Sequence, residues 1–338
     1  MTLNLANNMQ SAVEKELQSQ IGRLNEPNTN EFYEMMTYHM GWSGEGLGEN
    51  TSGKRIRPLL LLLCSASGNP DYAWQNALPG AAAIELVHNF SLIHDDIQDH
   101  SDKRRNRPTV WRKWGVPQAI NAGDGLYALS NLVLLDLLRN NQAEIVMRAA
   151  LIFHNTCLNL TRGQYMDMSY ESRTNLALKE YWPMIANKTA ALISASTEIG
   201  AILTGLNKQS SEVYRQFGHY LGLAYQIKDD ILGIWGNEIQ TGKSVISDLI
   251  TGKKTLPVLY GIHKKGIFSR RWYEGNIMVD EAPEIADQLA KEGARLYAEE
   301  TTDQMVEMAL KFLNIMAPQG SAGEILFDLT FQLLKRDA

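Results

Sequence analysis

Apolar residues recur at helical spacing along most of the chain. Leu126, Leu129, Val133 and Leu137 are three or four residues apart, which places them on one face of an α-helix. The period-two alternation typical of strands is hard to find over strand length. Segments of about 15 to 30 residues lie between Gly- and Pro-rich breaks such as 68–70. The pattern predicts an all-α protein, a large helical bundle with one core.

Two stretches interrupt this pattern. Residues 42–53, directly after Gly41, predict a glycine-rich loop, and residues 264–281, which contain four basic residues, predict a solvated connection. Neither a Ser/Gly linker nor a shift in composition marks a domain boundary. We therefore predict a single domain over residues 1–338, with a motif-bearing core at about 45–260.

Composition excludes several classes of protein. The chain has 338 residues, 44% of them hydrophobic and 21% charged, as in ordinary globular proteins. The longest strictly apolar run, 59–64, is far too short to span a membrane. The first cation is Lys15 and no apolar run follows it, so we expect no secretory leader. A net charge of −6 argues against nucleic acid or an anionic membrane as partner.

Cys64 and Cys157 both lie in apolar, helical-looking sequence. A disulfide between them is one reading. Two buried free thiols in a reducing compartment is the reading that the context favours, and it makes the cytoplasm the expected location.

The first candidate for chemistry is an acidic cluster at 95–99. Asp95 and Asp99 are four residues apart and share one face of a helix, although like charges at that spacing are mutually unfavourable. Their neighbours, Phe90 and Ile97 among them, are apolar, so this is not a plain solvated face. Carboxylates in this arrangement suit Mg²⁺, which commonly links them to substrate phosphates.

A second acidic pair, Asp229 and Asp230, again follows apolar helical sequence. Taken alone, it is also compatible with a helix-end surface pair. If the two helices face each other, their carboxylates converge on one cavity in which Mg²⁺ ions bind a diphosphate.

Cations occur near both clusters. Lys54 and Arg57 precede a helix in which Pro58 fits the first position, and helix N-termini favour anions. Arg104 and Arg105 follow the first cluster. Further along the chain come Lys188, Lys243 and Lys253. His88 lies seven residues before Asp95; it is either a satisfied core histidine or part of the same cavity.

At these residues the sequence resembles the trans-isoprenyl diphosphate synthases, the polyprenyl synthetase family. The family's motifs correspond to Gly53–Pro58, Asp95–Asp99 with Arg104–Thr109, Gly163–Asp167, Lys188–Ala190, Gln226 with Asp229 and Asp230, and Lys243, Asp248 and Lys253. The resemblance implies an all-α fold of the isoprenoid synthase type with a central substrate cavity.

The resemblance also implies a role for each matched residue. Isopentenyl diphosphate is expected at Lys54, Arg57, His88 and Arg105, and the allylic diphosphate at Arg104, Lys188, Lys243 and Lys253. Metal ligands are expected at Asp95, Asp99 and Asp229, with Asp96, Asp230 and Asp248 in the outer shell; Thr189 and Gln226 stabilise the cation. About three magnesium ions per active site and a homodimer are further expectations.

The implied reaction is a head-to-tail condensation. Diphosphate leaves the allylic substrate when its growing negative charge is stabilised in a dry site. The alkene of isopentenyl diphosphate then attacks the allylic cation. The departing diphosphate takes the proton that is lost, so no protein nucleophile is needed.

Three positions depart from the family pattern. Gly233 stands where many members have a third Asp in the second motif, and Asn106 and Ile246 stand where Gly is usual. We expect Asp229 to suffice for the metal, and the other two changes to affect loop geometry alone.

Product length depends in this family on the residues four and five positions before the first Asp. Here they are the small Ser91 and the large Phe90, a combination that resembles makers of C15 to C20 all-trans products. Neighbouring helices, including the stretch around Tyr127, also influence the floor of the hydrocarbon tunnel.

Three other functions compete with this one. A histidine–aspartate phosphohydrolase leaves the second acidic pair unexplained, and a class I terpene cyclase needs a second metal motif that is not evident. A non-catalytic partner subunit of a prenyl synthase is suggested by Gly233, but it predicts eroded cations, whereas all of those named above are present.

Overall fold

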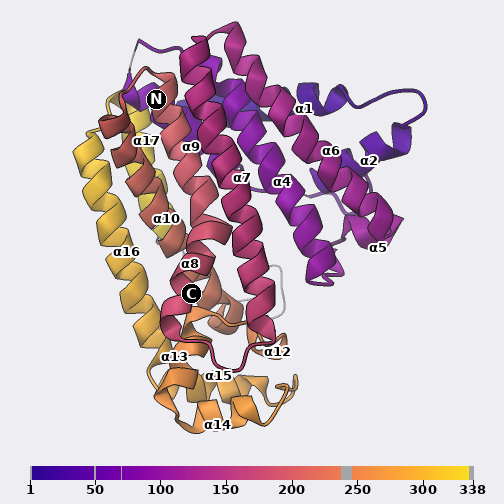
Figure 1. Ribbon diagram of the computed structural model, residues 1–338, viewed down its shortest axis with the longest axis vertical. Helices are drawn as coiled ribbons and strands as arrows, with labels where there is room; N and C mark the ends of the chain where they lie inside the picture. Colours follow the sequence, from indigo (N-terminus) through magenta and orange to yellow (C-terminus); the bar gives the residue numbers. More distant parts are fainter. Residues whose placement is uncertain (1, 49–50, 70, 237–245, 335–338) are drawn as a thin grey trace. The chain divides into compact units, whose positions relative to one another are not determined.

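A computed structural model describes residues 2–48, 51–69, 71–236 and 246–334. Within these ranges the protein is almost entirely helical, so the predicted all-α class is confirmed (Figure 1). The strands of this part of the chain are β1, Lys103–Arg104, and β2, Arg107–Pro108, which pair antiparallel.

The helices follow one another with short connections. In the first half they are α1 (Thr2–Gly22), α2 (Asn30–His39), α3 (Ile56–Gly68), η1 (Trp74–Ala77), α4 (Leu78–Gln98), α5 (Val110–Trp114), α6 (Val116–Leu135), η2 (Asp136–Arg139) and α7 (Ala143–Glu171). In the second half they are η3 (Leu178–Glu180), α8 (Tyr181–Ile185), the π-helical turn η4 (Ala186–Ala190), α9 (Ala191–Leu203), α10 (Lys208–Trp235), α12 (Ser247–Ile250), α13 (Leu256–Lys264), α14 (Ile267–Tyr273), α15 (Ala282–Lys291), α16 (Ala294–Met316) and α17 (Gly320–Leu334).

Contacts divide the chain into two compact units. The first unit comprises Met1–Cys157, Leu192–Arg215 and Leu313–Asp328; the second comprises Leu158–Ala191, Gln216–Phe312 and Leu329–Ala338. Each is described by itself below. The single domain expected for residues 1–338 stays a prediction.

In the first unit, α4 and α6 lie side by side (Figure 1). Small residues at 80–83 of α4 are fully buried and permit close packing. The helices are also close near the end of α4, where a Cβ on Gly123 of α6 would lie 2.3 Å from Nε2 of His94. This packing fixes the end of α4, the segment that carries Asp95 and Asp99.

The turn between β1 and β2 explains why Asn106 is accommodated. Arg105 and Asn106 have φ values of 51° and 61°. Positive φ at both central residues of a two-residue hairpin corresponds to a type I′ turn, in which asparagine is favoured almost as strongly as glycine. The departure at Asn106 is therefore compatible with a tight hairpin.

The prediction of an irregular connection over 264–281 was wrong in part, because α14 forms inside it. The Glu292 carboxylate accepts hydrogen bonds from the backbone N–H groups of Ile267 and Phe268, at 2.7 and 3.0 Å. The side chain of Phe268 is fully buried in the core of the second unit. A distant acidic residue thus completes the start of a short helix, which local sequence does not reveal.

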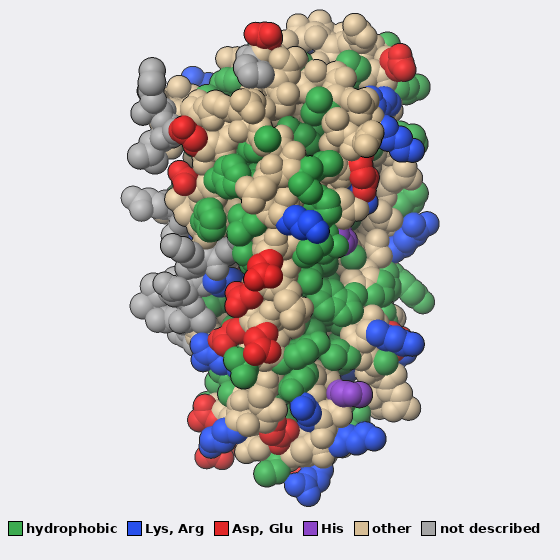
Figure 2. Space-filling view, turned by 90° about the vertical axis from the view of Figure 1, so that its left-hand side faces the viewer, with side chains coloured by type: hydrophobic (Ala, Val, Ile, Leu, Met, Phe, Trp, Pro, Cys, Tyr) green, Lys and Arg blue, Asp and Glu red, His purple; other side chains and the backbone are tan. Residues whose placement is uncertain are grey.

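The surface shown in Figure 2 mixes basic and acidic side chains among hydrophobic ones, so this face is not a uniform basic surface. Among the described residues, none of the helices combines the length and the apolar character needed to cross a membrane.

Candidate active site

The first unit gathers four arginines around the start of α3 and the end of α4. Arg55 and Arg57 come from the loop before α3 and its first turn, and Arg104 and Arg105 come from the hairpin. All four act electrostatically on His88, so they lie close to one another. Such a concentration of positive charge in a partly buried place suits a polyanionic ligand.

Two of these arginines are neutralised by carboxylates. Arg104 grips Asp96, donating from Nε to both carboxylate oxygens at 2.9 Å, and its Nη2 lies 3.8 Å from Oδ2 of Asp95. Arg55 is paired with Glu14 and Glu85. Among the described residues, Arg57 and Arg105 have no carboxylate partner, which leaves their charge for a ligand.

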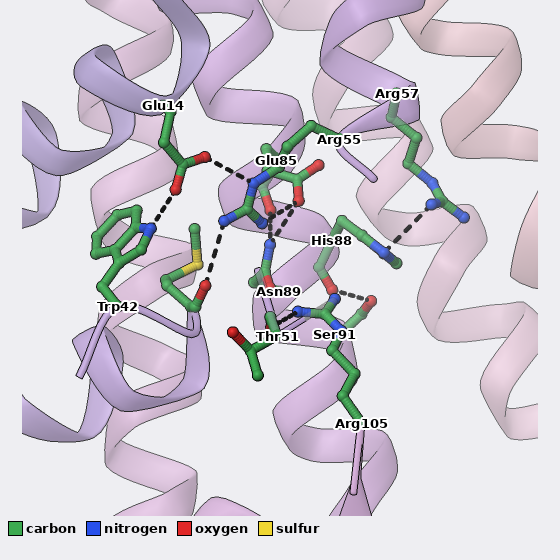
Figure 3. Close-up of polar contacts among 11 residues, drawn as sticks. Glu14, Trp42, Thr51, Arg55, Arg57, Glu85, His88, Asn89, Ser91 and Arg105 are labelled. Carbon is green, nitrogen blue, oxygen red and sulfur yellow. Dashed lines mark hydrogen bonds and ion pairs between the residues drawn. The ribbon is translucent and has the colours of Figure 1, made fainter. Parts of the chain in front are cut away.

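Arg57 is prepared for an acceptor that the protein does not supply. One guanidinium nitrogen, Nη1, lies 3.2 Å from Nε2 of His88, while Nε is buried without a hydrogen-bond partner in the structure (Figure 3). A buried donor without an acceptor is costly, so it indicates a ligand oxygen at this position.

His88 is neutral in this environment. Burial, followed by the charges of Arg57, Arg104, Arg105 and Arg55, lowers its pKa well below the usual value for histidine. Because an arginine only donates, Nε2 of His88 must accept the hydrogen bond from Arg57. A neutral His88 therefore holds the Arg57 side chain without adding a further charge.

Arg105 lies against the glycine-rich loop. Its Nη1 donates to the carbonyl oxygen of Thr51 at 2.7 Å, and a Cβ on Gly53 would stand 2.6 Å from its Nη2. Burial and the nearby charges of Arg55 and Arg104 lower the pKa of Arg105 to about 10. Gly53 is thus required both for its positive φ of 78° and for the space that Arg105 occupies.

The metal candidates in this unit stand at the end of α4. Asp95 and Asp99 are partly exposed one helical turn apart, and the backbone N–H of Asp99 caps the helix on the carbonyl of Asp95 at 2.8 Å. Asp96 is buried under Arg104, as expected of an outer-shell residue. No described group of three or more His, Cys, Asp or Glu side chains is assembled as a metal site. Two carboxylates nevertheless match Mg²⁺, which usually takes one or two of them together with water and substrate phosphates.

The second unit brings together the Lys-Thr-Ala segment and the second acidic motif. This segment forms the π-helical turn η4, a geometry often found at functional sites. A Cβ on Gly163 of α7 would lie 2.2 Å from the backbone nitrogen of Lys188, and one on Gly222 of α10 would lie 2.6 Å from Cα of Ala190. Two glycines therefore let α7 and α10 close on this turn.

A chain of hydrogen bonds orients Thr189 and Gln226. Asp230 is buried and accepts from Tyr181 Oη at 2.7 Å, from the Leu256 N–H at 3.0 Å and from Gln226 Nε2 at 2.8 Å. The amide oxygen of Gln226 in turn accepts from the Thr189 hydroxyl. Burial raises the pKa of Asp230 to about 7. Asp230 acts as an internal anchor, while Asp229 on the same helix is exposed.

The remaining second-unit residues are placed as follows. The ammonium of Lys188 forms an ion pair with Asp167 of the Gly-Gln-x-x-Asp motif. The backbone N–H of Lys253 donates to the Asp248 carbonyl at 2.9 Å. Lys243 lies outside the described residues. The predicted convergence of Asp95 with Asp229 concerns two units that are described separately, and it stays a prediction.

Two departures from the family pattern have structural counterparts here. A Cβ on Gly233 would lie 2.1 Å from Oδ2 of Asp248, so the Asp248 carboxylate occupies the space that a third Asp side chain of the motif would need. Ile246 adopts a left-handed conformation with φ of 71°, which is strained for a β-branched residue and explains why glycine suits this position.

Sequence reasoning missed several supporting residues. Arg55 lies inside the quoted Gly-Lys-x-x-Arg-Pro motif but was given no role, and Glu85 is an isolated acid in an apolar helix, a signal that a buried partner exists. Asp167 was noted without a function. Nothing in the local sequence points to Glu14 or Tyr181.

The helical fold and a diphosphate-sized cluster of cations beside paired carboxylates define a class of prenyl-transferring helical enzymes. The polyprenyl synthetase family model matches residues 46–289. The (2E,6E)-farnesyl diphosphate synthase of Mycobacterium tuberculosis is 38% identical over 315 residues, 90% of this chain and 86% of that protein. The geranylgeranyl pyrophosphate synthase of Geoglobus acetivorans is 36% identical over 285 residues, 84% and 87% of the two chains.

Solved structures agree. The geranylgeranyl pyrophosphate synthetase of Pyrococcus horikoshii matches with a TM-score of 0.88 at 29% identity, over 99% of this chain and 98% of that one. The chain belongs to the polyprenyl synthetase family, and it is a prenyltransferase. Enzymes of this family are generally magnesium-dependent.

Neutral His88 makes stability depend on pH. A histidine whose pKa is lowered by folding binds fewer protons in the folded than in the unfolded state, so stability is complete above about pH 6.5 and is lost as the pH falls below it. We expect the free energy of unfolding to fall by up to about 1.4 kcal/mol per pH unit for this group. Denaturant titrations at pH 5 to 8 measure this. Gln can accept from Arg57 but does not titrate, so His88→Gln is expected to be less acid-sensitive. Equal slopes for both proteins would contradict the assignment.

Proposed function

We propose that this protein condenses isopentenyl diphosphate head-to-tail with an allylic diphosphate to form a C15 to C20 all-trans product. The single observation that supports the proposal most is the sorting of charge around α3 and α4. Arg57 and Arg105 keep their charge for a ligand, beside two carboxylates on α4. The relatives named farnesyl and geranylgeranyl diphosphate synthase support the product range.

In this proposal each substrate has its own residues. Lys54, Arg57, His88 and Arg105 bind isopentenyl diphosphate. Arg104, Lys188, Lys243 and Lys253 bind the allylic diphosphate. Asp95, Asp99 and Asp229 hold about three magnesium ions, with Asp96, Asp230 and Asp248 supporting them. When bound, magnesium supplies positive charge that stabilises the departing diphosphate.

The residues of the chain then direct the bond changes. Lysine and arginine side chains stabilise negative charge as the C–O bond of the allylic substrate breaks. The Thr189 hydroxyl donates to Gln226, so its oxygen lone pairs are left to face developing positive charge. The alkene of isopentenyl diphosphate forms the new C–C bond, and the departing diphosphate accepts the released proton. Closely packed apolar helices keep water from the cation.

The direct test uses the purified chain with Mg²⁺, isopentenyl diphosphate and geranyl diphosphate. We expect a chromatographically resolved product of C15 or C20. The same assay separates the competing functions, since a non-catalytic partner subunit gives no extended product alone and a class I terpene cyclase releases a hydrocarbon or alcohol. Absence of extended product under all conditions would refute the proposal.

Asp95→Ala tests the metal assignment within this assay. Because Asp95 is partly exposed at a helix end, we expect a change in stability of only about 0.5 kcal/mol, whereas kcat falls about 10³-fold or more through lost charge stabilisation. Exposed Asp102, which pairs with Arg112 outside the cluster, provides the control Asp102→Ala, which is expected to stay active. A near-normal rate for Asp95→Ala contradicts the assignment.

Phe90→Ala tests the proposed floor of the hydrocarbon tunnel. The Phe90 ring packs against Tyr127 of α6 with centroids 5.1 Å apart, and against His94 at 4.9 Å, while Ser91 bonds to the His88 carbonyl. Removing the ring opens space beside Tyr127, so we expect the product to lengthen by at least one isoprene unit. Product analysis by mass spectrometry measures this, and an unchanged product spectrum would place the floor elsewhere.

We also propose a homodimer, supported by exposed apolar side chains on α6 and α7. Leu132, Leu135, Met147 and Leu151 are between 52% and 71% exposed. Exposed apolar side chains of this size are typical of subunit interfaces. We expect a dimer in sedimentation analysis and a monomer for the double variant Met147→Glu, Leu151→Glu. A monomeric parent protein would refute this assembly.

The expected location is likewise a proposal. Cys64 and Cys157 are both buried free thiols, and burial raises the pKa of Cys157 to about 12, which makes it unreactive. Unpaired cysteines favour a reducing compartment, the cytoplasm.

A further inference from the structure

Arg55 is a charged residue that the proposed function leaves without a role. It is 6% exposed, and it stands between Lys54 and Arg57, the cations assigned to isopentenyl diphosphate. Its backbone has φ of 48° and ψ of 39°, a left-handed conformation that is unfavourable for a residue with a side chain. It occupies the N-cap position of α3, where it donates no capping side-chain bond.

The Arg55 side chain is fully committed to the protein (Figure 3). Its Nε donates to Glu14 of α1 at 3.1 Å, its Nη1 donates to Glu85 of α4 at 2.8 Å, and its Nη2 lies 3.4 Å from the Met40 carbonyl. All of its nitrogens are engaged, so the guanidinium is not a further substrate ligand.

The two carboxylates are themselves held in place. The indole N–H of Trp42 donates to Glu14, and Asn89 donates to the Glu85 carboxylate at 3.0 Å and to its own-helix carbonyl at 2.8 Å. Glu85 is 3% exposed. A buried carboxylate needs a cation and further donors, and here it has both.

The pairing also keeps the charges separate. Arg55 lies close enough to His88 and Arg105 to lower their pKa values by repulsion. Glu14 and Glu85 offset that positive charge where it serves no ligand. Arg57 and Arg105 have no such partner among the described residues, so the net positive charge is concentrated on them.

We propose that Arg55 is a positioning residue for the isopentenyl diphosphate site. Its ion pairs with Glu14 and Glu85 tie the turn before α3 to α1 and α4, and hold it in the left-handed conformation. This fixes the directions in which Lys54 leaves the loop and Arg57 enters the first turn of α3, opposite His88. The inference rests on the proposed function, because it assigns these two cations to that substrate.

Arg55→Lys tests the inference. Lysine keeps the charge but, as a point donor, does not reproduce the planar fork that reaches Glu14 and Glu85 together. We expect the KM for isopentenyl diphosphate to rise about tenfold, the lower end of losses seen when supporting contacts are removed around metal sites. The KM for geranyl diphosphate and kcat should stay within about twofold.

Arg271→Lys is the matched control. Arg271 makes a comparable two-bond contact with Glu281 next to α14, within the second unit and outside every proposed substrate site. We expect neither KM to change for this variant. If Arg55→Lys fails to fold, the double variant Arg55→Met, Glu85→Met avoids a stranded buried charge and is expected to show the same selective KM increase.

A measurement without turnover separates this inference from the proposed function. Calorimetric titration of isopentenyl diphosphate alone should give about tenfold weaker binding for Arg55→Lys than for the parent protein. A parent protein that makes no product refutes the proposed function, and the binding comparison still tests Arg55. Unchanged binding and KM with a lower melting temperature, or an equal rise in both KM values, would overturn the positioning role.

Discussion

Repulsion between like charges governs the first unit. A site for a diphosphate requires several cations close together, yet four arginines beside one another oppose folding unless some are neutralised. The fold meets this requirement by giving Arg55 and Arg104 buried carboxylate partners and by keeping His88 uncharged. The charge that remains belongs to Arg57 and Arg105, which face the place where a ligand is needed.

Close helix approach governs the second unit. Gly163 and Gly222 allow α7 and α10 to contact the backbone of the π-helical turn, where any side chain would collide. That contact places Thr189 beside Gln226, and Asp230 holds the amide of Gln226 in one orientation. The glycine of the Gly-Gln-x-x-Asp motif is therefore a packing requirement, and the neighbouring polar residues are arranged by it.

Part of this was predictable from sequence. The helical period predicted the all-α class, and the aspartate and arginine motifs predicted the family and its chemistry, because both signals depend on spacing within a short stretch. The irregular connection expected over 264–281 was wrong where α14 forms, since the cap that completes it comes from Glu292. Asn106 was compatible with the hairpin because asparagine tolerates the left-handed conformation.

The sequence by itself determined which residue types stand at which helical positions: paired carboxylates on one face, cations before a helix, a large ring below them. Only the tertiary structure decided which charges cancel. Glu14, Arg55 and Glu85 lie on separate elements, and their pairing follows from how α1, α3 and α4 pack. Partners across such distances are set by packing, which carries no local pattern that a single sequence displays.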